Sequence, residues 1–119
     1  MPRILAIEDD DDLQYLYDMM LSRRGYDVTK ANNITDSIVR LTHEPFDLII
    51  LDMNMPDFPG TKVIEFVLGD SHLEHIPILI VSANEHWRER AYSLGVKHFL
   101  TKPITMQTLI ERVEFLLRQ

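Results

Sequence analysis

Short apolar runs alternate with amphipathic stretches along the chain, a pattern typical of strands and helices in turn. The first run, residues 3–8, is continuous rather than alternating, as in a parallel strand that is buried on both faces. The next stretch predicts a helix that Asp11 caps and Gly25 ends. Its apolar residues recur at spacings of three, one, three and one, on one helical face: Leu13, Leu16, Tyr17, Met20 and Leu21.

The same strand and helix couplet recurs four more times. Strands are predicted at residues 26–31, 48–52, 78–82 and 98–101. The helices after them carry the apolar stripes Ile34, Ile38 and Leu41; Val63, Ile64, Val67 and Leu68; Trp87, Ala91 and Leu94, ended by Gly95; and Met106, Leu109, Ile110, Val113, Leu116 and Leu117. Short links force parallel strands, because each helix carries the chain back to the end where the previous strand began. The sequence therefore predicts an α/β fold with a doubly wound, five-stranded parallel sheet.

Length and composition limit the classes of protein that fit this pattern. A chain of 119 residues has room for one domain, expected to span 1–119, and 45% hydrophobic residues suit an ordinary globular protein. The absence of cysteine excludes disulfides and thiolate sites, and no apolar stretch is long enough for a membrane span, so a cytoplasmic location is expected. A net charge of −7 argues against direct binding of nucleic acid.

Polar residues stand where the predicted strands end: Glu8 and Asp9, Asp52, Ser82 and Lys102. In a doubly wound sheet the carboxyl ends of the strands share one edge, so these side chains should converge there. Two carboxylates roughly 5 Å apart repel by about 3 kcal/mol at an effective dielectric constant of about 20, and a divalent cation would compensate. An all-oxygen donor set without cysteine or a nearby histidine favours Mg²⁺ over Zn²⁺ or Cu²⁺.

These residues suggest phosphoryl transfer as the chemistry of the site. A bound Mg²⁺ would neutralise phosphoryl oxygens while Asp52 attacks in line, Lys102 would hold another oxygen, and the Ser82 hydroxyl would donate to a third. The plainer interpretation of an acidic run is a solvated helix start that the helix dipole favours, and it is kept for residues 10–12. Asp52 is therefore predicted to be the phosphoryl acceptor.

Four segments in order resemble the receiver domain of two-component response regulators of the chemotaxis and OmpR types, and the likeness runs over residues 3–117. The segments are 4–10 (ILAIEDD), 47–56 (DLIILDMNMP, with Gly60 after it), 77–83 (PILIVSA) and 95–103 (GVKHFLTKP). The resemblance implies a flavodoxin-like (βα)5 fold with strand order 2-1-3-4-5.

The resemblance also implies roles for individual residues. A histidine kinase or phosphotransfer protein would donate phosphate to Asp52. Asp9 would ligate Mg²⁺ directly. Glu8 stands where the family more often has Asp, and it would bind Mg²⁺ mainly through a water molecule. The main-chain carbonyl of Asn54 would complete the metal site, and the peptide bond between Lys102 and Pro103 would be cis.

In the family, phosphorylation moves a hydroxyl, here that of Ser82, and an aromatic switch, here Phe99, turns into the space behind it. This movement would alter the surface of the fourth helix, fifth strand and fifth helix, which is also a candidate homodimer face. A Phe that only packs beside the last strand is the alternative for Phe99. Trp87, Tyr92 and Phe115 are candidates for a partner surface or for ordinary core and surface aromatics.

Two other functions fit part of this pattern. Some Mg²⁺-dependent phosphatases also use a strand-terminal Asp nucleophile, but they typically place a second Asp two residues later, where this chain has Asn54. A pseudo-receiver would work without phosphate, and the complete set of acidic residues, Ser82 and Lys102 argues against it. The expected function is a signalling domain that catalyses only its own phosphorylation and dephosphorylation. The residues specify neither the kinase, the regulated process, the phosphoryl lifetime nor an attached output domain.

Overall fold

Five parallel strands form one sheet in the computed structural model, which describes residues 1–118. The strands are β1 (Arg3–Ile7), β2 (Asp27–Ala31), β3 (Leu48–Leu51), β4 (Ile78–Ser82) and β5 (His98–Thr101). Their order is β2-β1-β3-β4-β5, and every neighbouring pair is parallel. This order confirms the predicted doubly wound sheet, and it places the point where strand order reverses between β1 and β3.

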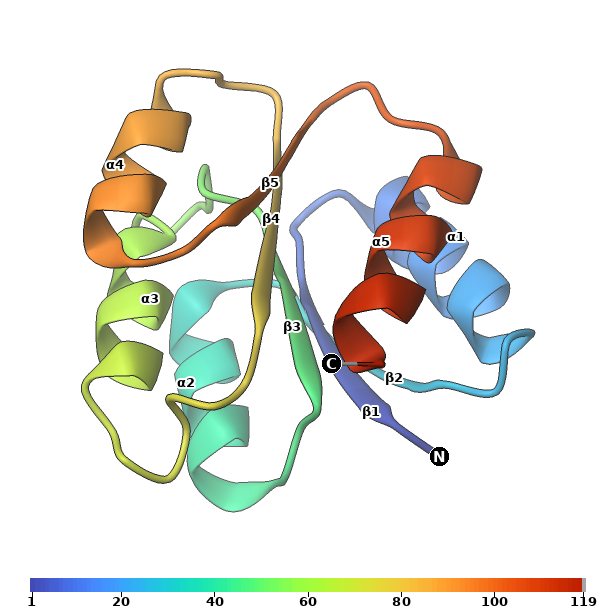
Figure 1. Cartoon of the computed structure of the whole chain (residues 1–119), viewed down its shortest axis with the longest axis horizontal. Coiled ribbons are helices and arrows are strands. Elements are labelled where there is room, and N and C mark those ends of the chain that lie inside the picture. The colour runs from blue at the N-terminus through green and yellow to red at the C-terminus, as the bar shows by residue number, and fades with distance from the viewer. Residues whose placement is uncertain (119) are drawn as a thin grey trace.

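Helices cover both faces of the sheet. They are α1 (Asp11–Ser22), α2 (Ile34–His43), α3 (Thr61–Leu68), α4 (Trp87–Leu94) and α5 (Met106–Leu117). Helices α1 and α5 lie on one face, and α2, α3 and α4 lie on the other (Figure 1). Within residues 1–118, no helix combines the length and the apolar character that crossing a membrane requires.

The central strands are apolar without interruption because each face of the sheet has its own core. Ile4 packs with Tyr17 and Leu21 of α1 on one side, whereas Leu5 packs on the other side with residues of α2, α3 and α4. Both Ile4 and Leu5 are fully buried. The alternation of side chains along a strand thus supplies two cores, which fix the sheet and leave only the strand ends for polar chemistry.

The cap of α1 differs from the prediction by one residue. Asp10, not Asp11, is the N-cap: its backbone is extended, and its carboxylate accepts hydrogen bonds from the N–H groups of Asp12 and Leu13. Asp11 is the first helical residue, so its backbone does not have the extended conformation of a cap. The helix ends at Ser22, and Gly25 follows in the turn with a φ of +88°.

The strands end at or just before the predicted polar residues. Strand β2 begins at Asp27 instead of Tyr26, β1 ends at Ile7, and β3 ends at Leu51. Glu8 and Asp52 are therefore the first residues after their strands rather than the last residues within them. In these positions their side chains lie at the carboxyl edge of the sheet.

Candidate functional site

Three carboxylates meet at the carboxyl edge of the sheet. Glu8, Asp9 and Asp52 each offer one oxygen, and these oxygens lie within 4.8 Å of one another, the only such group among residues 1–118. Glu8 and Asp52 are buried, with 2% and 7% exposure, whereas Asp9 is exposed. The structure therefore brings together the acids that the sequence pattern placed at this edge.

Lys102 supplies positive charge to the buried pair. Its Nζ lies 2.7 Å from Oε1 of Glu8 and 3.5 Å from Oδ2 of Asp52. The cis peptide bond between Lys102 and Pro103 is present, as the family resemblance implied. Burial acts to lower the pKa of Lys102, but the hydrogen bond to Glu8 and the charges of both acids outweigh it and raise the pKa, so Lys102 stays charged.

The charge of Glu8 is unfavourable in its buried position. Burial raises its pKa, and this effect outweighs the hydrogen bonds from Lys102 and from the Asp10 N–H, while the charge of Asp52 raises the pKa further. One ammonium group therefore does not fully compensate the carboxylates. The donors are all hard oxygens, so the residues present fit Mg²⁺ as the compensating ion.

The loop after β3 holds Asn54 beside the predicted acceptor. The N–H of Asn54 donates to Oδ1 of Asp52 at 3.2 Å, and Gly60 returns the loop by donating its N–H to the carbonyl of Met53 at 2.9 Å. A Cβ on Gly60 would lie 2.9 Å from the Met53 Cα, so only glycine fits this return. The tight loop places the main chain of Asn54 within reach of the acidic cluster.

Asp57 ties the same loop to the start of α2, a contact that the sequence did not predict. Its carboxylate accepts hydrogen bonds from the N–H groups of Ile34, Thr35 and Phe58 and from the Thr35 hydroxyl, at 2.8 to 3.0 Å. Partial desolvation acts to raise the pKa of Asp57, but these hydrogen bonds outweigh it and lower the pKa to about 2. The carboxylate and Ile34 are 23 residues apart, so no local pattern announces this cap.

The back of the site is held by Gln14 of α1. Its side-chain Nε2 donates to the carbonyls of Ala6, Glu8 and Ala31 at 2.9, 3.0 and 3.2 Å, which joins α1 to the ends of β1 and β2. Among the described residues, the Oε1 of Gln14 and the hydroxyl of Tyr17 are buried without a partner. Burial, followed by the nearby carboxylates, raises the pKa of Tyr17, which therefore stays a neutral phenol.

Ser82 and Phe99 lie on the two last strands beside Lys102. Ser82 is fully buried, and its Oγ accepts the N–H of Asn84 at 3.2 Å, which leaves the hydroxyl proton free to donate. The Lys102 N–H donates to the Ser82 carbonyl at 2.8 Å. Phe99 is 4% exposed and belongs to the core on the side of α2, α3 and α4, and the Arg88 guanidinium lies 4.6 Å from the ring centroid.

Arg88 also joins the start of α4 to β5. It donates to the Thr101 hydroxyl and to the Tyr92 hydroxyl, each at 3.1 Å, and it pairs with Glu85, which also accepts from Thr101. The hydrogen bonds from Arg88 and then Thr101 lower the pKa of Glu85. Sequence reasoning missed this cluster, although Glu85 and Arg88 stand at the i,i+3 spacing of helical ion pairs.

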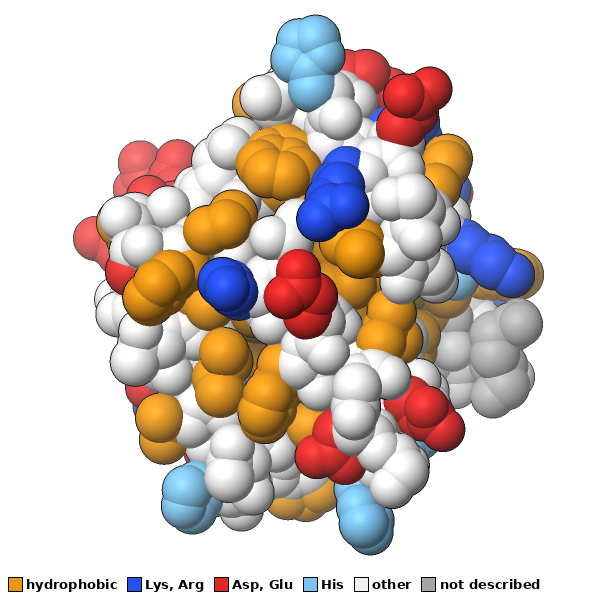
Figure 2. Space-filling model, turned by 90° about the vertical axis from the view of Figure 1, so that its left-hand side faces the viewer, with side chains coloured by type: hydrophobic (Ala, Val, Ile, Leu, Met, Phe, Trp, Pro, Cys, Tyr) orange, Lys and Arg blue, Asp and Glu red, His pale blue; other side chains and the backbone are white. Residues whose placement is uncertain are grey.

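The three aromatics that the sequence left open differ in their surroundings. Trp87 is half-buried against the core on the α3 and α4 side, and its Nε1 donates to Oδ1 of Asn54 at 3.0 Å. Tyr92 and Phe115 are 47% and 49% exposed. On the face formed by α2, α3 and α4, hydrophobic side chains are interrupted by charged ones (Figure 2).

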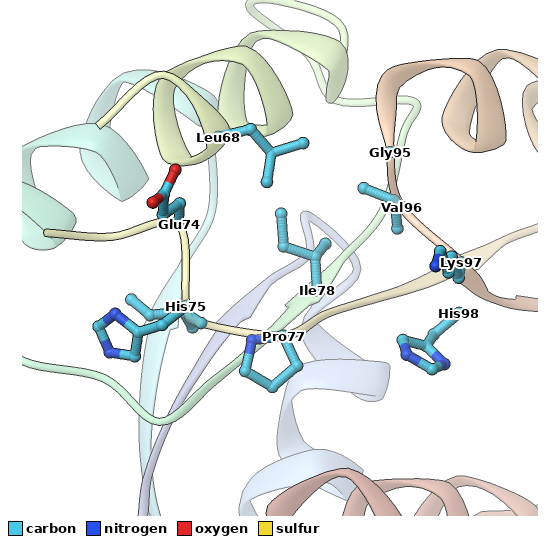
Figure 3. Close-up of a pocket in the computed structure, with 10 residues that line it drawn as sticks. Leu68, Glu74, His75, Pro77, Ile78, Gly95, Val96, Lys97 and His98 are labelled. Carbon is cyan, nitrogen blue, oxygen red and sulfur yellow. The ribbon is translucent and has the colours of Figure 1, made fainter. Parts of the chain in front are cut away.

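A separate pocket lies at the opposite end of the sheet, where β4 and β5 begin (Figure 3). Its volume is about 170 Å³, and Leu68, His75, Pro77 and His98 are among its lining residues. Burial lowers the pKa of His98, with smaller effects from Arg112 and Lys97. No residue of the acidic cluster reaches this pocket, so the carboxylates and Lys102 are confined to the other end.

Comparison with known sequences decides the family. The family model of the response regulator receiver domain matches residues 4–114, nearly the whole chain. The chain belongs to this family. Receiver domains act in two-component signalling, and phosphorylation with bound Mg²⁺ is the expected chemistry of the family.

Individual relatives show how the receiver is used elsewhere. PilH of Pseudomonas aeruginosa is 28% identical over 119 residues, and the match covers 98% of each chain. The DNA-binding dual master transcriptional regulator RpaA of Synechocystis is 33% identical over 122 residues, which cover 100% of this chain but 50% of RpaA. The response regulator TrrA of Thermotoga maritima, solved in complex with Mg²⁺ and BeF, is 26% identical with a TM-score of 0.87, and the match covers 98% of this chain and 99% of TrrA.

Proposed function

We propose that Asp52 of this receiver accepts a phosphoryl group from a histidine kinase or phosphotransfer protein in a Mg²⁺-dependent reaction. The observation that carries the proposal is the convergence of Glu8, Asp9 and Asp52, with the Lys102 Nζ placed against both buried acids. We also propose that residues 1–119 form one receiver domain.

The side chains divide the transfer step among them. An oxygen of Asp52 attacks phosphorus in line, the bond from phosphorus to the donor nitrogen breaks, and the electron pair leaves with the imidazole of the donor. Lys102 neutralises one phosphoryl oxygen, and the Ser82 hydroxyl donates to another. Mg²⁺, held by Glu8 through water, by Asp9 and Asp52, and by the Asn54 carbonyl, would neutralise the charge that develops on the phosphoryl group. The protein thus contributes mainly position and charge.

The acceptor is tested with acetyl phosphate and Mg²⁺, followed by intact mass. Wild type is expected to gain the mass of one phosphoryl group, whereas Asp52→Ala is expected to gain none because it lacks the nucleophile. Asp12→Ala, which removes an exposed acid of α1, is the control and should be phosphorylated like wild type. Equal phosphorylation of Asp52→Ala would contradict the assignment.

We propose that catalysis is limited to the phosphorylation and dephosphorylation of Asp52 itself. Support comes from Asn54, which stands two residues after the acceptor and offers an amide where a phosphatase needs a second carboxylate. Steady-state phosphate release from a generic phosphate ester is expected to be absent. Sustained turnover of the ester would establish a phosphatase instead.

The signal is proposed to pass from Asp52 through Ser82 and Phe99 to the surface of α4, β5 and α5. Support comes from the free hydroxyl proton of Ser82 and from the stacking of Arg88 of α4 on the Phe99 ring. A phosphoryl group adds about 1.5 to 2 negative charges and three acceptor oxygens, which favour the packing that brings the hydroxyl closest. A homodimer through this surface stays a prediction, with Tyr92 and Phe115 exposed on it.

A further inference from the structure

Trp87 connects the first turn of α4 to the loop that carries the acceptor. Its indole N–H donates to Oδ1 of Asn54 at 3.0 Å, across 33 residues of sequence. The ring is half-buried against the core, so its orientation is set by packing as well as by the hydrogen bond. Trp87 is also the single tryptophan of the chain.

The amide that Trp87 engages lies next to the acceptor. The main-chain N–H of Asn54 donates to Oδ1 of Asp52 at 3.2 Å, which fixes this residue at the edge of the site. A surface hollow of about 370 Å³ is lined by Asp9, Asn54, Pro56 and Trp87 among others, so water has access to this side of the cluster. Asn54 therefore borders a hollow that reaches Asp9 of the acidic cluster, while its main chain contacts Asp52.

The oxygen and the nitrogen of a carboxamide close to a phosphoryl group interact differently with water. Its oxygen accepts a hydrogen bond and can orient an attacking water, as glutamine does in GTP hydrolysis by small GTPases. Its nitrogen only donates, and a donor cannot draw a proton from water. The indole N–H of Trp87 takes one of the two lone pairs of the Asn54 Oδ1 and fixes the direction of the amide, so this oxygen is less available to orient a nucleophilic water.

We propose that Trp87 is a positioning residue that withholds the Asn54 amide oxygen from water and so prolongs the life of the acyl phosphate on Asp52. This inference rests on the proposed function. In the step that Trp87 slows, a water oxygen bonds to phosphorus and the bond from phosphorus to the Asp52 oxygen breaks. Asp52 keeps the electron pair as a carboxylate, and the water proton leaves with inorganic phosphate.

A double-mutant cycle tests the inference. Wild type, Trp87→Phe, Asn54→Ala and the double variant are loaded with acetyl phosphate and Mg²⁺, freed of donor, and followed by intact mass. Trp87→Phe keeps an aromatic ring but removes the N–H donor, and its phosphoryl group is expected to be lost about fivefold faster, the size of one hydrogen bond. In the Asn54→Ala background the same substitution is expected to change nothing, because no amide oxygen remains to be released.

One spectroscopic measurement and two additional variants separate positioning from a general effect on folding. The indole N–H gives one resonance in the ¹H–¹⁵N spectrum, and Asn54→Ala is expected to shift it upfield in the unphosphorylated protein, where the hydrogen bond is lost. Ser93→Ala, which removes an exposed polar group from the same helix, is the matched control and should lose phosphate like wild type. Trp87→Leu also lacks the donor and should behave like Trp87→Phe.

The outcomes distinguish this inference from the function on which it rests. Normal loading with an unchanged rate of loss in Trp87→Phe, or equal acceleration with and without the Asn54 amide, overturns the role of Trp87 and leaves the acceptor intact. A wild-type protein that takes up no phosphoryl group overturns both. Acceleration confined to proteins that contain Asn54 supports the inference.

Discussion

The acidic residues of the site oppose folding while they serve the chemistry. Glu8 and Asp52 are buried close to Asp9, and burial together with neighbouring charge raises the pKa of Glu8, which marks an unfavourable charge. Lys102 relieves only part of this cost. Residues selected for binding an ion are expected to lower the stability of the protein that lacks it.

Replacement of Asp9 with Asn tests this trade-off. In buffer with EDTA, the free energy of unfolding of the variant is expected to equal that of wild type or to exceed it by up to about 1 kcal/mol, because one of the repelling charges is removed. The effect is small because Asp9 is exposed and solvent screens its charge. Mg²⁺ at about 100 times its Kd should stabilise wild type by about 2.7 kcal/mol, and this gain should vanish in the variant. Thermal unfolding with and without Mg²⁺ measures both effects, with Asp12→Asn as the control that keeps the gain. An equal Mg²⁺ gain in Asp9→Asn would place the ion elsewhere.

Sequence reasoning placed the site residues by their positions at strand ends, because those positions follow from the direction of the chain alone. Glu8, Asp52 and Lys102 meet as predicted. The contacts of Trp87 and Arg88 were not predicted, since each joins segments that are distant in sequence and depends on side-chain direction. The apolar pattern of the strands predicts which residues lie at the edge of the sheet, but it does not predict which loop the side chains of a helix contact.

At the scale of elements, the apolar patterns located all ten helices and strands of residues 1–118, with shifts at some ends. The pattern was sufficient because strands buried on both faces are continuous runs, whereas helices covering the sheet keep a stripe. The cap of α1 was misplaced because Asp10 and Asp11 have the same chemistry, and only the backbone conformation distinguishes them.

The carboxylate of Asp57, in the loop after β3, caps the start of α2, and this makes the stability of the protein depend on pH. Asp57→Ala is expected to lower the free energy of unfolding by about 1 kcal/mol at neutral pH, the usual cost of losing a helix cap. The pKa of Asp57 is about 2 in the folded protein, below the value of about 3.9 for an unfolded chain. The stabilisation is therefore fully present above that unfolded value and lost as the pH falls toward 2.

Urea unfolding of wild type and Asp57→Ala from pH 7 down to about pH 2 measures this dependence. The gap between the two proteins should narrow steadily below about pH 4. Asp57→Asn, which keeps one acceptor oxygen without the charge, is the control: the difference in stability between Asp57→Asn and Asp57→Ala should be independent of pH, because neither side chain titrates. A gap for Asp57→Ala that stays constant down to the lowest pH would show that the charge of Asp57 is irrelevant.

At the scale of the whole molecule, the doubly wound sheet places Asp52 directly after the central strand β3, and Ser82 and Phe99 on β4 and β5. The residue pattern predicted parallel strands, but the order 2-1-3-4-5 came from the family resemblance. Local periodicity does not specify which neighbour a strand pairs with, because each pairing buries a similar apolar surface. The order matters for the proposed signal, since it puts Ser82 of β4 beside the strand that precedes Asp52, and Phe99 of β5 beside β4.

Ser82→Ala tests whether this arrangement carries the signal. The variant is expected to accept phosphate at Asp52 but to show a smaller change in hydrogen exchange in α4 and β5, because the hydroxyl that would meet the phosphoryl oxygens is missing. Mass spectrometry of the exchanged protein, before and after loading with acetyl phosphate, measures the change. Ser93→Ala, on the outer part of α4, is the control and should respond like wild type. A full response in Ser82→Ala would mean that the signal takes another route.

The side-chain amide of Gln14 makes the two sides of the site differ in how firmly they are held. The side behind Glu8 is tied to the ends of β1 and β2, and the other side faces α4. By collecting carbonyls from the ends of β1 and β2, the Gln14 amide completes the wall behind Glu8 during folding, before any ion or phosphate arrives. That side has no reorganisation left to make at the moment of transfer. On the opposite side, single side chains of α4 hold the loop after β3 and the Phe99 ring. We therefore expect a phosphoryl group on Asp52 to move the α4 side and to leave the wall behind Glu8 in place.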